Sequence, residues 1–160
     1  MSKCVVIGVT GGIAVYKALD VISALRKKDI EVHVIMTESA SKFVNPLTFQ
    51  SISQNMVVTD MFAEPKAWEI QHISLAQKAD LMLIAPATAN VIGKISNGIA
   101  DDMLSTTLLA CRCKKLVAPA MNTNMYLNPI VQDNMKRLQN YGFEMLEAAS
   151  GHLACGDSGI

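Results

Sequence analysis

Cys4-Val5-Val6-Ile7-Gly8-Val9-Thr10-Gly11-Gly12-Ile13-Ala14 is the stretch that decides the fold class of this chain. It begins with an uninterrupted apolar run, which is typical of a parallel strand buried on both faces. The glycines that follow allow a tight turn, and residues 13–28 then carry apolar side chains at helical spacing. A second apolar run at residues 32–36 completes a strand–helix–strand unit. We expect the crossover of this unit to be right-handed.

The same alternation continues through the rest of the chain. Three further apolar runs predict strands, at residues 81–85, 116–118 and 143–146. Three segments with helical spacing or helix-start residues predict helices, at 74–79, 101–111 and 128–141. Residues 45–68 are predicted to be irregular, and residues 148–160 to form a glycine-punctuated tail. The sequence therefore predicts a single α/β domain over residues 1–160, a doubly wound parallel sheet with helices on both faces.

Composition limits the possible partners. The chain has 160 residues, of which 51% are hydrophobic and 18% charged, so one domain with a sizeable core is expected. Its 14 basic and 14 acidic residues cancel, which argues against a nucleic-acid partner or an anionic membrane surface. We see no apolar run long enough to span a bilayer and no signal-peptide pattern. The four cysteines match neither paired zinc spacing nor a dense disulfide framework, so we expect a cytoplasmic protein.

The glycine turn is the first candidate binding site. Its glycines let the backbone approach a phosphate, the following helix supplies free N–H groups, and Thr10 adds a hydroxyl. The spacing does not match the dinucleotide fingerprint, and no Walker lysine follows. A tight turn without any ligand is the alternative interpretation. After the second strand, Glu38 could bind a ribose, but Thr37 and Ser39 flank it with hydroxyls, which favour a phosphate and hence FMN over NAD.

Two later strand ends carry small and polar residues. Pro86, Thr88 and Asn90 follow the third predicted strand, at the edge where open α/β sheets bind ligands. Thr88 or Asn90 acting only as a helix cap is the alternative. Asn122 follows the fourth strand, and its NH2 group could bind a carboxylate while its carbonyl holds the side chain in place. A plain turn with a methionine plug is the alternative there.

Among the histidines and cysteines, one of each is a candidate for catalysis, namely His72 and Cys155. His72 lies just before a predicted helix and could act as a general base, although a surface or capping histidine is the simpler interpretation. Cys155 lies among glycines and could sit on a mobile lid, with a frayed tail as the alternative. His33 is expected to be structural, and His152 with Cys155 does not make a metal site. We expect no metal ion, and inert buried thiols at the remaining cysteines, Cys4, Cys111 and Cys113.

Taken together, these segments resemble the homo-oligomeric flavin-containing cysteine decarboxylases, and the resemblance covers essentially the whole chain. The matching segments, in family order, are the glycine-rich start at 8–14, His72-Ile73-Ser74-Leu75, Ala85-Pro86-Ala87-Thr88-Ala89-Asn90, Gly98-Ile99-Ala100-Asp101-Asp102, Pro119-Ala120-Met121-Asn122-Thr123-Asn124-Met125 and Leu153-Ala154-Cys155-Gly156. The resemblance implies bound FMN, a flavodoxin-like (Rossmann-type) sheet, and homotrimers or trimer-based dodecamers with active sites between subunits.

The resemblance also implies roles for individual residues. By motif position, His72 matches the active-site histidine, Asn122 the substrate-binding asparagine and Cys155 the cysteine of the substrate lid. Met125 and Ala154 are expected to contact substrate beside Asn122. The residues expected to bind FMN are Thr10, Gly11, Gly12, Ile13, Ala14, Thr37, Ser39, Pro86, Thr88, Ala89, Asn90, Ser105 and Ala120.

The activity implied is that of a carboxy-lyase in coenzyme A biosynthesis. It converts 4′-phospho-N-pantothenoyl-L-cysteine to 4′-phosphopantetheine through a thioaldehyde and an enethiolate. The chemistry needs a flavin because decarboxylation leaves electrons on a carbon without a sink until the CH2–SH group is oxidised. A peptidyl-cysteine decarboxylase and a flavoprotein-like regulatory binding module are the alternatives. Functional coupling to a phosphopantothenate–cysteine ligase is expected, with that synthase domain absent from residues 1–160.

Overall fold

The computed structural model describes residues 2–59, 73–146, 151–152 and 158–159. Five parallel strands form one sheet, in the spatial order β2-β1-β3-β4-β5. Their bounds are β1 Cys4–Val9, β2 Glu31–Met36, β3 Leu81–Ala87, β4 Lys114–Pro119 and β5 Glu144–Met145. This order is the flavodoxin-like variant of the doubly wound fold, which confirms the predicted fold class.

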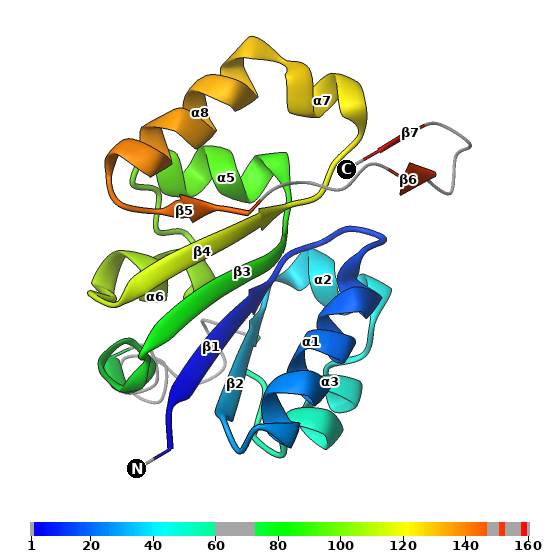
Figure 1. Cartoon of the computed structure of the whole chain (residues 1–160), viewed down its shortest axis with the longest axis vertical. Helices are drawn as coiled ribbons and strands as arrows, with labels where there is room; N and C mark the ends of the chain where they lie inside the picture. Colours follow the sequence, from blue (N-terminus) through cyan, green and yellow to red (C-terminus); the bar gives the residue numbers. More distant parts are fainter. Residues whose placement is uncertain (1, 60–72, 147–150, 153–157, 160) are drawn as a thin grey trace.

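Helices cover both faces of this sheet (Figure 1). One layer consists of α1 (Val15–Lys27), α2 (Glu38–Phe43) and α3 (Pro46–Ser53). The other consists of residues 73–78, α5 (Ala89–Ser96), α6 (Met103–Ala110) and α8 (Pro129–Asn140), with the short α7 (Thr123–Leu127) before α8. Because each layer packs on the sheet, two apolar cores form, one on each face.

The inner strand β1 shows why its sequence is apolar throughout. In β1, Val5, Ile7 and Val9 point into the core beneath α1, whereas Cys4 and Val6 point into the core beneath α5 and α6. Successive side chains of a strand alternate between faces, and both faces of β1 are covered. All six residues of β1 are therefore buried.

Side-chain caps begin six of the seven helices whose N-cap residue the structure describes, and α1 starts without one. In each of the six, a side-chain oxygen accepts a hydrogen bond from a backbone N–H of the first turn; the capping residues are Thr37, Asn45, Thr88, Asp102, Asn122 and Asn128. α1 instead starts after Ala14, with no side-chain cap. The N–H groups of Val15 and Lys17 donate instead to the backbone carbonyls of Gly12 (3.1 Å) and Ala14 (3.0 Å).

Two expectations about irregular segments were wrong. Part of the stretch 45–68 forms helix α3, because Asn45 caps it, Pro46 fits its first position and Phe49 is fully buried beneath it. In the tail, β6 (Gly151–His152) pairs with β7 (Ser158–Gly159) as a short antiparallel ladder. Periodicity is a weak signal for elements this short.

None of the helices in the described part of the chain combines the length and the apolar character needed to cross a bilayer.

Candidate functional site

The hydroxyl of Thr10 joins the turns that follow β1 and β3. It donates a hydrogen bond to the carbonyl of Pro86 (2.6 Å) and accepts one from the backbone N–H of Thr88 (3.0 Å). Thr10 itself is fully buried. Its expected place in FMN binding is therefore below the surface, where it holds two turns of the binding edge against each other.

Backbone hydrogen bonds extend this contact to the outer strands. The N–H of Thr37 donates to the carbonyl of Val9 (3.0 Å), and the N–H of Ala120 donates to the carbonyl of Ala87 (3.0 Å). The segments after β1, β2, β3 and β4 consequently lie next to one another at the carboxyl edge of the sheet, where ligands bind in folds of this type.

A cavity of about 360 Å³ opens at this edge. Five of the residues predicted to bind a cofactor line it, namely Gly11, Thr37, Ser39, Thr88 and Asn90. These five residues come from three different turns, after β1, β2 and β3, and the structure brings them together around one cavity. Five more residues complete the lining: Glu38, Val91, Lys94, Asp101 and Asp102.

Two acidic side chains of the cavity already have partners. The Asp101 carboxylate forms an ion pair with Lys94, with Oδ2 and Nζ 3.0 Å apart. The Asp102 carboxylate caps α6 and accepts hydrogen bonds from the backbone N–H (2.8 Å) and hydroxyl (2.6 Å) of Ser105. Ser105, another predicted cofactor residue, is buried within this capping box. The α6 side of the cavity is therefore a self-contained polar network.

Gly11 of the glycine turn lies on the opposite side of the cavity, four residues before the first residue of α1. Gly11 and Gly12 precede Ile13, which is exposed, and Ala14, which occupies the N-cap position. The positive end of the helix dipole favours an anion close to such a turn. This side of the cavity can hold a phosphate group.

Gly11 is required because the turn lies against the first turn of α2. A β-carbon at position 11 would lie 2.9 Å from the backbone carbon of Ser39 and 3.2 Å from the backbone nitrogen of Ala40. At Gly12 the nearest atom would be the Thr88 methyl at 4.0 Å, an ordinary contact.

Asn122 lies at the end of β4, outside the lining of this cavity. Its Oδ1 accepts a hydrogen bond from the backbone N–H of Met125 (2.9 Å), which fixes the amide as the cap of α7. The Nδ2 group then remains as the donor, as the sequence suggested. The Met125 side chain is exposed beside it.

The remaining predicted residues divide into two groups. Pro86 is buried, and Ala89 and Ala120 are partly buried next to the strand ends. His72, Ala154 and Cys155 lie outside the described residues, so their expected roles stay predictions.

Cys4 and Cys111 are buried free thiols, and burial raises the pKa of the partly buried Cys113 to about 12, in line with the expectation of unreactive thiols.

Sequence reasoning missed Lys94 and gave Asp101 and Asp102 no part in cofactor binding. Lys94 lies on α5, a helix that we had not predicted from the sequence. The signal that could have found it is Thr88, which caps α5 and puts Lys94 on the same side as the cavity.

Comparisons with known proteins agree with this arrangement. A family model described as Flavoprotein matches residues 1–160. The bifunctional coenzyme A biosynthesis protein CoaBC of Bacillus subtilis is 53% identical over 155 residues, which are 97% of this chain and 38% of that protein. A probable phosphopantothenoylcysteine decarboxylase of Streptococcus mutans is 42% identical over 161 residues, covering 99% of this chain and 90% of that protein.

A solved structure is similar over nearly the whole fold. The FMN-dependent cysteine decarboxylase SpaF has a TM-score of 0.84 and 31% identity, covering 99% of this chain and 90% of its own. The chain spans only 37% to 40% of the length of the bifunctional relatives that it matches.

The contact of Gly11 with α2 gives a prediction about stability. Replacing Gly11 by alanine should lower the free energy of unfolding by about 1–3 kcal/mol, because the new methyl group meets backbone atoms that cannot turn away. Gly12→Ala is the matched control and should stay close to the wild type. Urea unfolding of both variants measures the difference, and equal stability of the two would contradict the close packing described.

Proposed function

Because this chain belongs to the flavoprotein family, we propose that it binds FMN non-covalently at the carboxyl edge of its sheet and uses it to decarboxylate 4′-phospho-N-pantothenoyl-L-cysteine, forming 4′-phosphopantetheine. The observation that carries the proposal is the cavity in which Gly11, Ser39 and Thr88 meet. The names of the Streptococcus mutans relative and of SpaF support the reaction and the cofactor, respectively.

The residues of the cavity fit FMN. The cavity lies between the ends of β1 and β3, where the strand order reverses, which is the usual ligand crevice of an open α/β sheet. Its α1 side offers backbone N–H groups to a phosphate. Its α6 side carries acidic groups, so the phosphate is expected at the glycine turn, next to Ser39.

Helix capping does not prevent Thr37 and Thr88 from binding the cofactor. Thr37 Oγ1 accepts from Ala40 N–H (3.2 Å), and Thr88 Oγ1 accepts from Val91 N–H (3.3 Å). Each hydroxyl thereby uses a lone pair and keeps its hydrogen, which can be donated to a phosphate or ribityl oxygen. Helix capping and cofactor binding, the two interpretations that the sequence left open for Thr88, are thus compatible.

Bound FMN would supply a reversible two-electron oxidation of the substrate CH2–SH group, which provides the electron sink that decarboxylation needs. The protein's own residues have separate tasks. Asn122 donates its Nδ2 hydrogen bonds to the substrate carboxylate and so orients the bond that breaks. Met125, exposed beside it, covers the apolar part of the substrate.

His72 and Cys155 are proposed to move protons. His72 takes a proton from the substrate at the start of the reaction, because a neutral imidazole is a good base near neutral pH. Cys155 gives a proton to the enethiolate after CO2 has left, and Ala154 contacts substrate beside it. Both assignments rest on motif position within the family.

The proposal also includes partners. Exposed apolar side chains, among them Ile13, Tyr16, Leu127 and Ile130, support a homotrimer or a trimer-based dodecamer with active sites between subunits. The bifunctional relative supports coupling to a phosphopantothenate–cysteine ligase. Free thiols at Cys4, Cys111 and Cys113 suit a reducing cytoplasm.

FMN binding is tested by the cofactor that the protein releases on denaturation. Wild-type protein should release FMN, identified by mass. Ser39→Ala should weaken FMN binding by roughly 10- to 100-fold, since it removes a hydrogen bond to a charged phosphate. Ser41→Ala, a change on the same helix whose hydroxyl bonds the Glu38 carbonyl, is the matched control. The cofactor assignment fails if the reconstituted wild-type protein holds no FMN.

Decarboxylation is tested with the FMN-loaded protein and 4′-phospho-N-pantothenoyl-L-cysteine. We expect CO2 release from this compound and not from a peptide that ends in cysteine; the reverse preference would identify a peptidyl-cysteine decarboxylase. His72→Asn should release no CO2 while keeping its FMN. Cys155→Ser should release CO2 but give a product two hydrogens lighter, because a serine hydroxyl is a far weaker acid than a thiol with a pKa of about 8.5. Wild-type turnover by both variants would remove these roles.

Asn122 is tested by exchanging its donor for a negative charge. Asn122→Asp keeps the cap of α7, since an aspartate oxygen can accept from Met125 N–H, but it loses the Nδ2 donor. Substrate binding should weaken by a few kcal/mol, roughly, as two carboxylates then face each other. Asn124→Asp places the same charge on the exposed side of α7 and serves as control. Equal kcat/KM for Asn122→Asp and wild type would refute the role.

A further inference from the structure

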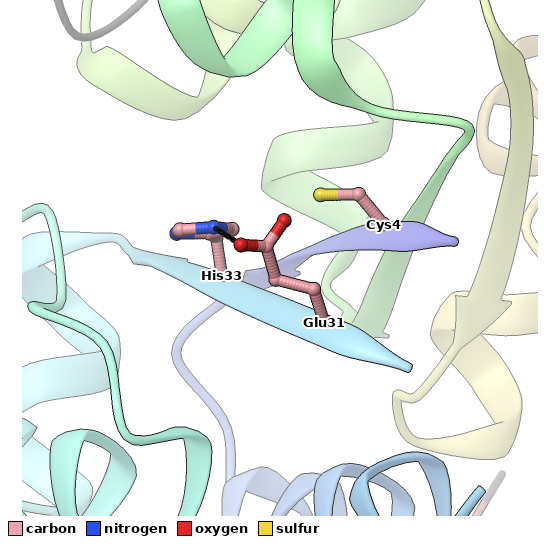
Figure 2. Close-up of side chains that lie close together, drawn as sticks. All are labelled: Cys4, Glu31 and His33. Carbon is pink, nitrogen blue, oxygen red and sulfur yellow. Dashed lines mark ion pairs between the residues drawn. The ribbon is translucent and has the colours of Figure 1, made fainter. Parts of the chain in front are cut away.

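A second polar cluster lies at the opposite edge of the sheet, where the strands begin. It consists of Cys4 on β1 and Glu31 and His33 on β2. Cys4 and Glu31 are partners in the parallel register, and His33 follows Glu31 by two residues, so all three side chains belong to one face. Figure 2 shows them standing on the same side of the two strands.

The three side chains offer different ligand atoms in a small space. A thiol sulfur, a carboxylate oxygen and an imidazole nitrogen lie within 4.8 Å of one another. His33 Nε2 is 3.6 Å from Glu31 Oε1, which is too long for a hydrogen bond. That nitrogen is buried and has no hydrogen-bond partner in the described part of the chain. A buried nitrogen without a hydrogen-bond partner is unfavourable, and a bound cation would use its lone pair.

The protonation states of the cluster have clear causes. Burial lowers the pKa of His33, which leaves a neutral imidazole with a lone pair. A hydrogen bond from Lys78, whose Nζ is 2.9 Å from Glu31 Oε1, lowers the pKa of Glu31 and keeps it a carboxylate. Burial raises the pKa of the Cys4 thiol to about 12, so the sulfur carries a proton. Asp80 is engaged separately, since its Oδ2 accepts from Cys4 N–H (2.8 Å).

We propose that Cys4, Glu31 and His33 bind a divalent cation of the zinc type. Sulfur, imidazole nitrogen and carboxylate oxygen are the ligands that Zn²⁺ takes in tetrahedral sites, and three protein ligands leave the fourth position for water. On binding, a Zn–S bond forms as the Sγ–H bond of Cys4 breaks. The proton leaves to solvent, and no electron is transferred.

Lys78 competes with the ion for the Glu31 carboxylate. Its ammonium group is 2.9 Å from Oε1, the same oxygen that lies 3.6 Å from His33 Nε2. The Lys78 side chain is 47% exposed, so it can turn into solvent without losing a buried contact. At an isolated thiol that binds metal non-specifically, the affinity for the metal ion would not depend on Lys78. At the proposed site it does, although Lys78 is not a ligand.

The cluster is separate from the FMN cavity. Cys4 begins β1, whereas Thr10 follows its last residue, which puts roughly 20 Å between the two edges at the rise of a parallel strand. The proposal departs from the expectation that His33 is only structural and that the chain holds no metal. It does not depend on the proposed FMN chemistry.

Co²⁺ is the probe for the test, because its complexes with thiolates absorb light. Titrating the FMN-loaded protein with Co²⁺ should give a difference spectrum with a thiolate-to-metal charge-transfer band that saturates at one ion per chain. Zn²⁺ should abolish the band. The band should be lost in Cys4→Ser and Cys4→Ala and weakened at least tenfold in affinity in Glu31→Gln and His33→Asn. A far-UV circular dichroism spectrum and an unfolding midpoint close to those of the wild type show that these variants are folded.

Two thiol controls assign the band to Cys4. Cys111→Ser removes another buried thiol, and Cys155→Ser removes the one in the tail; both should keep the band. Lys78→Met should tighten Co²⁺ binding by about two- to fivefold, the free energy of an exposed ion pair. A wild-type protein without the band, or a band that survives in Cys4→Ser, would overturn the proposed ligand set. Unchanged affinity in Lys78→Met would overturn the competition between Lys78 and the ion.

Discussion

The candidate FMN site depends on one buried hydroxyl, that of Thr10. It bonds both to the Pro86 carbonyl and to the Thr88 N–H, so the turn after β1 and the turn after β3 cannot separate without leaving buried polar groups unpaired. The strand order reverses between these two strands, and a crevice opens there in any sheet of this type. The hydroxyl gives the crevice a fixed width. On the β1 side of the crevice, the turn at Gly11 lies so close to Ser39 that a β-carbon at position 11 would meet the backbone of α2.

Several residues of the site serve folding and binding at once. Thr37, Thr88 and Asn122 cap helices through an oxygen lone pair, which fixes each side chain and leaves its hydrogen-bond donor directed elsewhere. Such a cap holds a donor in position before any ligand arrives, and pre-organisation of this kind lowers the entropy lost on binding. The uncapped start of α1 provides the complementary group, a set of backbone donors without a side-chain acceptor.

The two edges of the sheet differ in chemistry. The carboxyl edge gathers helix N-termini, hydroxyls and glycines, a combination suited to an anionic cofactor. The opposite edge gathers Cys4, Glu31 and His33, whose lone pairs suit a cation. Because β1 is fully buried and runs from one edge to the other, the same strand carries Cys4 at its start and leads into Thr10 at its end.

The sequence by itself determined the fold class and most of the candidate cofactor site. Its continuous apolar runs specify buried parallel strands, and the glycine turn, Thr37, Ser39 and Thr88 follow those strands directly, so their shared edge could be predicted. Local signals of this kind depend only on neighbours along the chain.

Only the tertiary structure decided the rest. Helix α3 is stabilised by the burial of Phe49 against α1 and β2, and no helical periodicity of apolar residues announces it in the sequence. Lys94 and Asp101 enter the cavity because α5 and α6 converge there. Cys4 meets Glu31 and His33 because strands 27 residues apart in sequence pair in register. Register, crossover and burial are set by packing between distant segments, and no local pattern in the sequence encodes them.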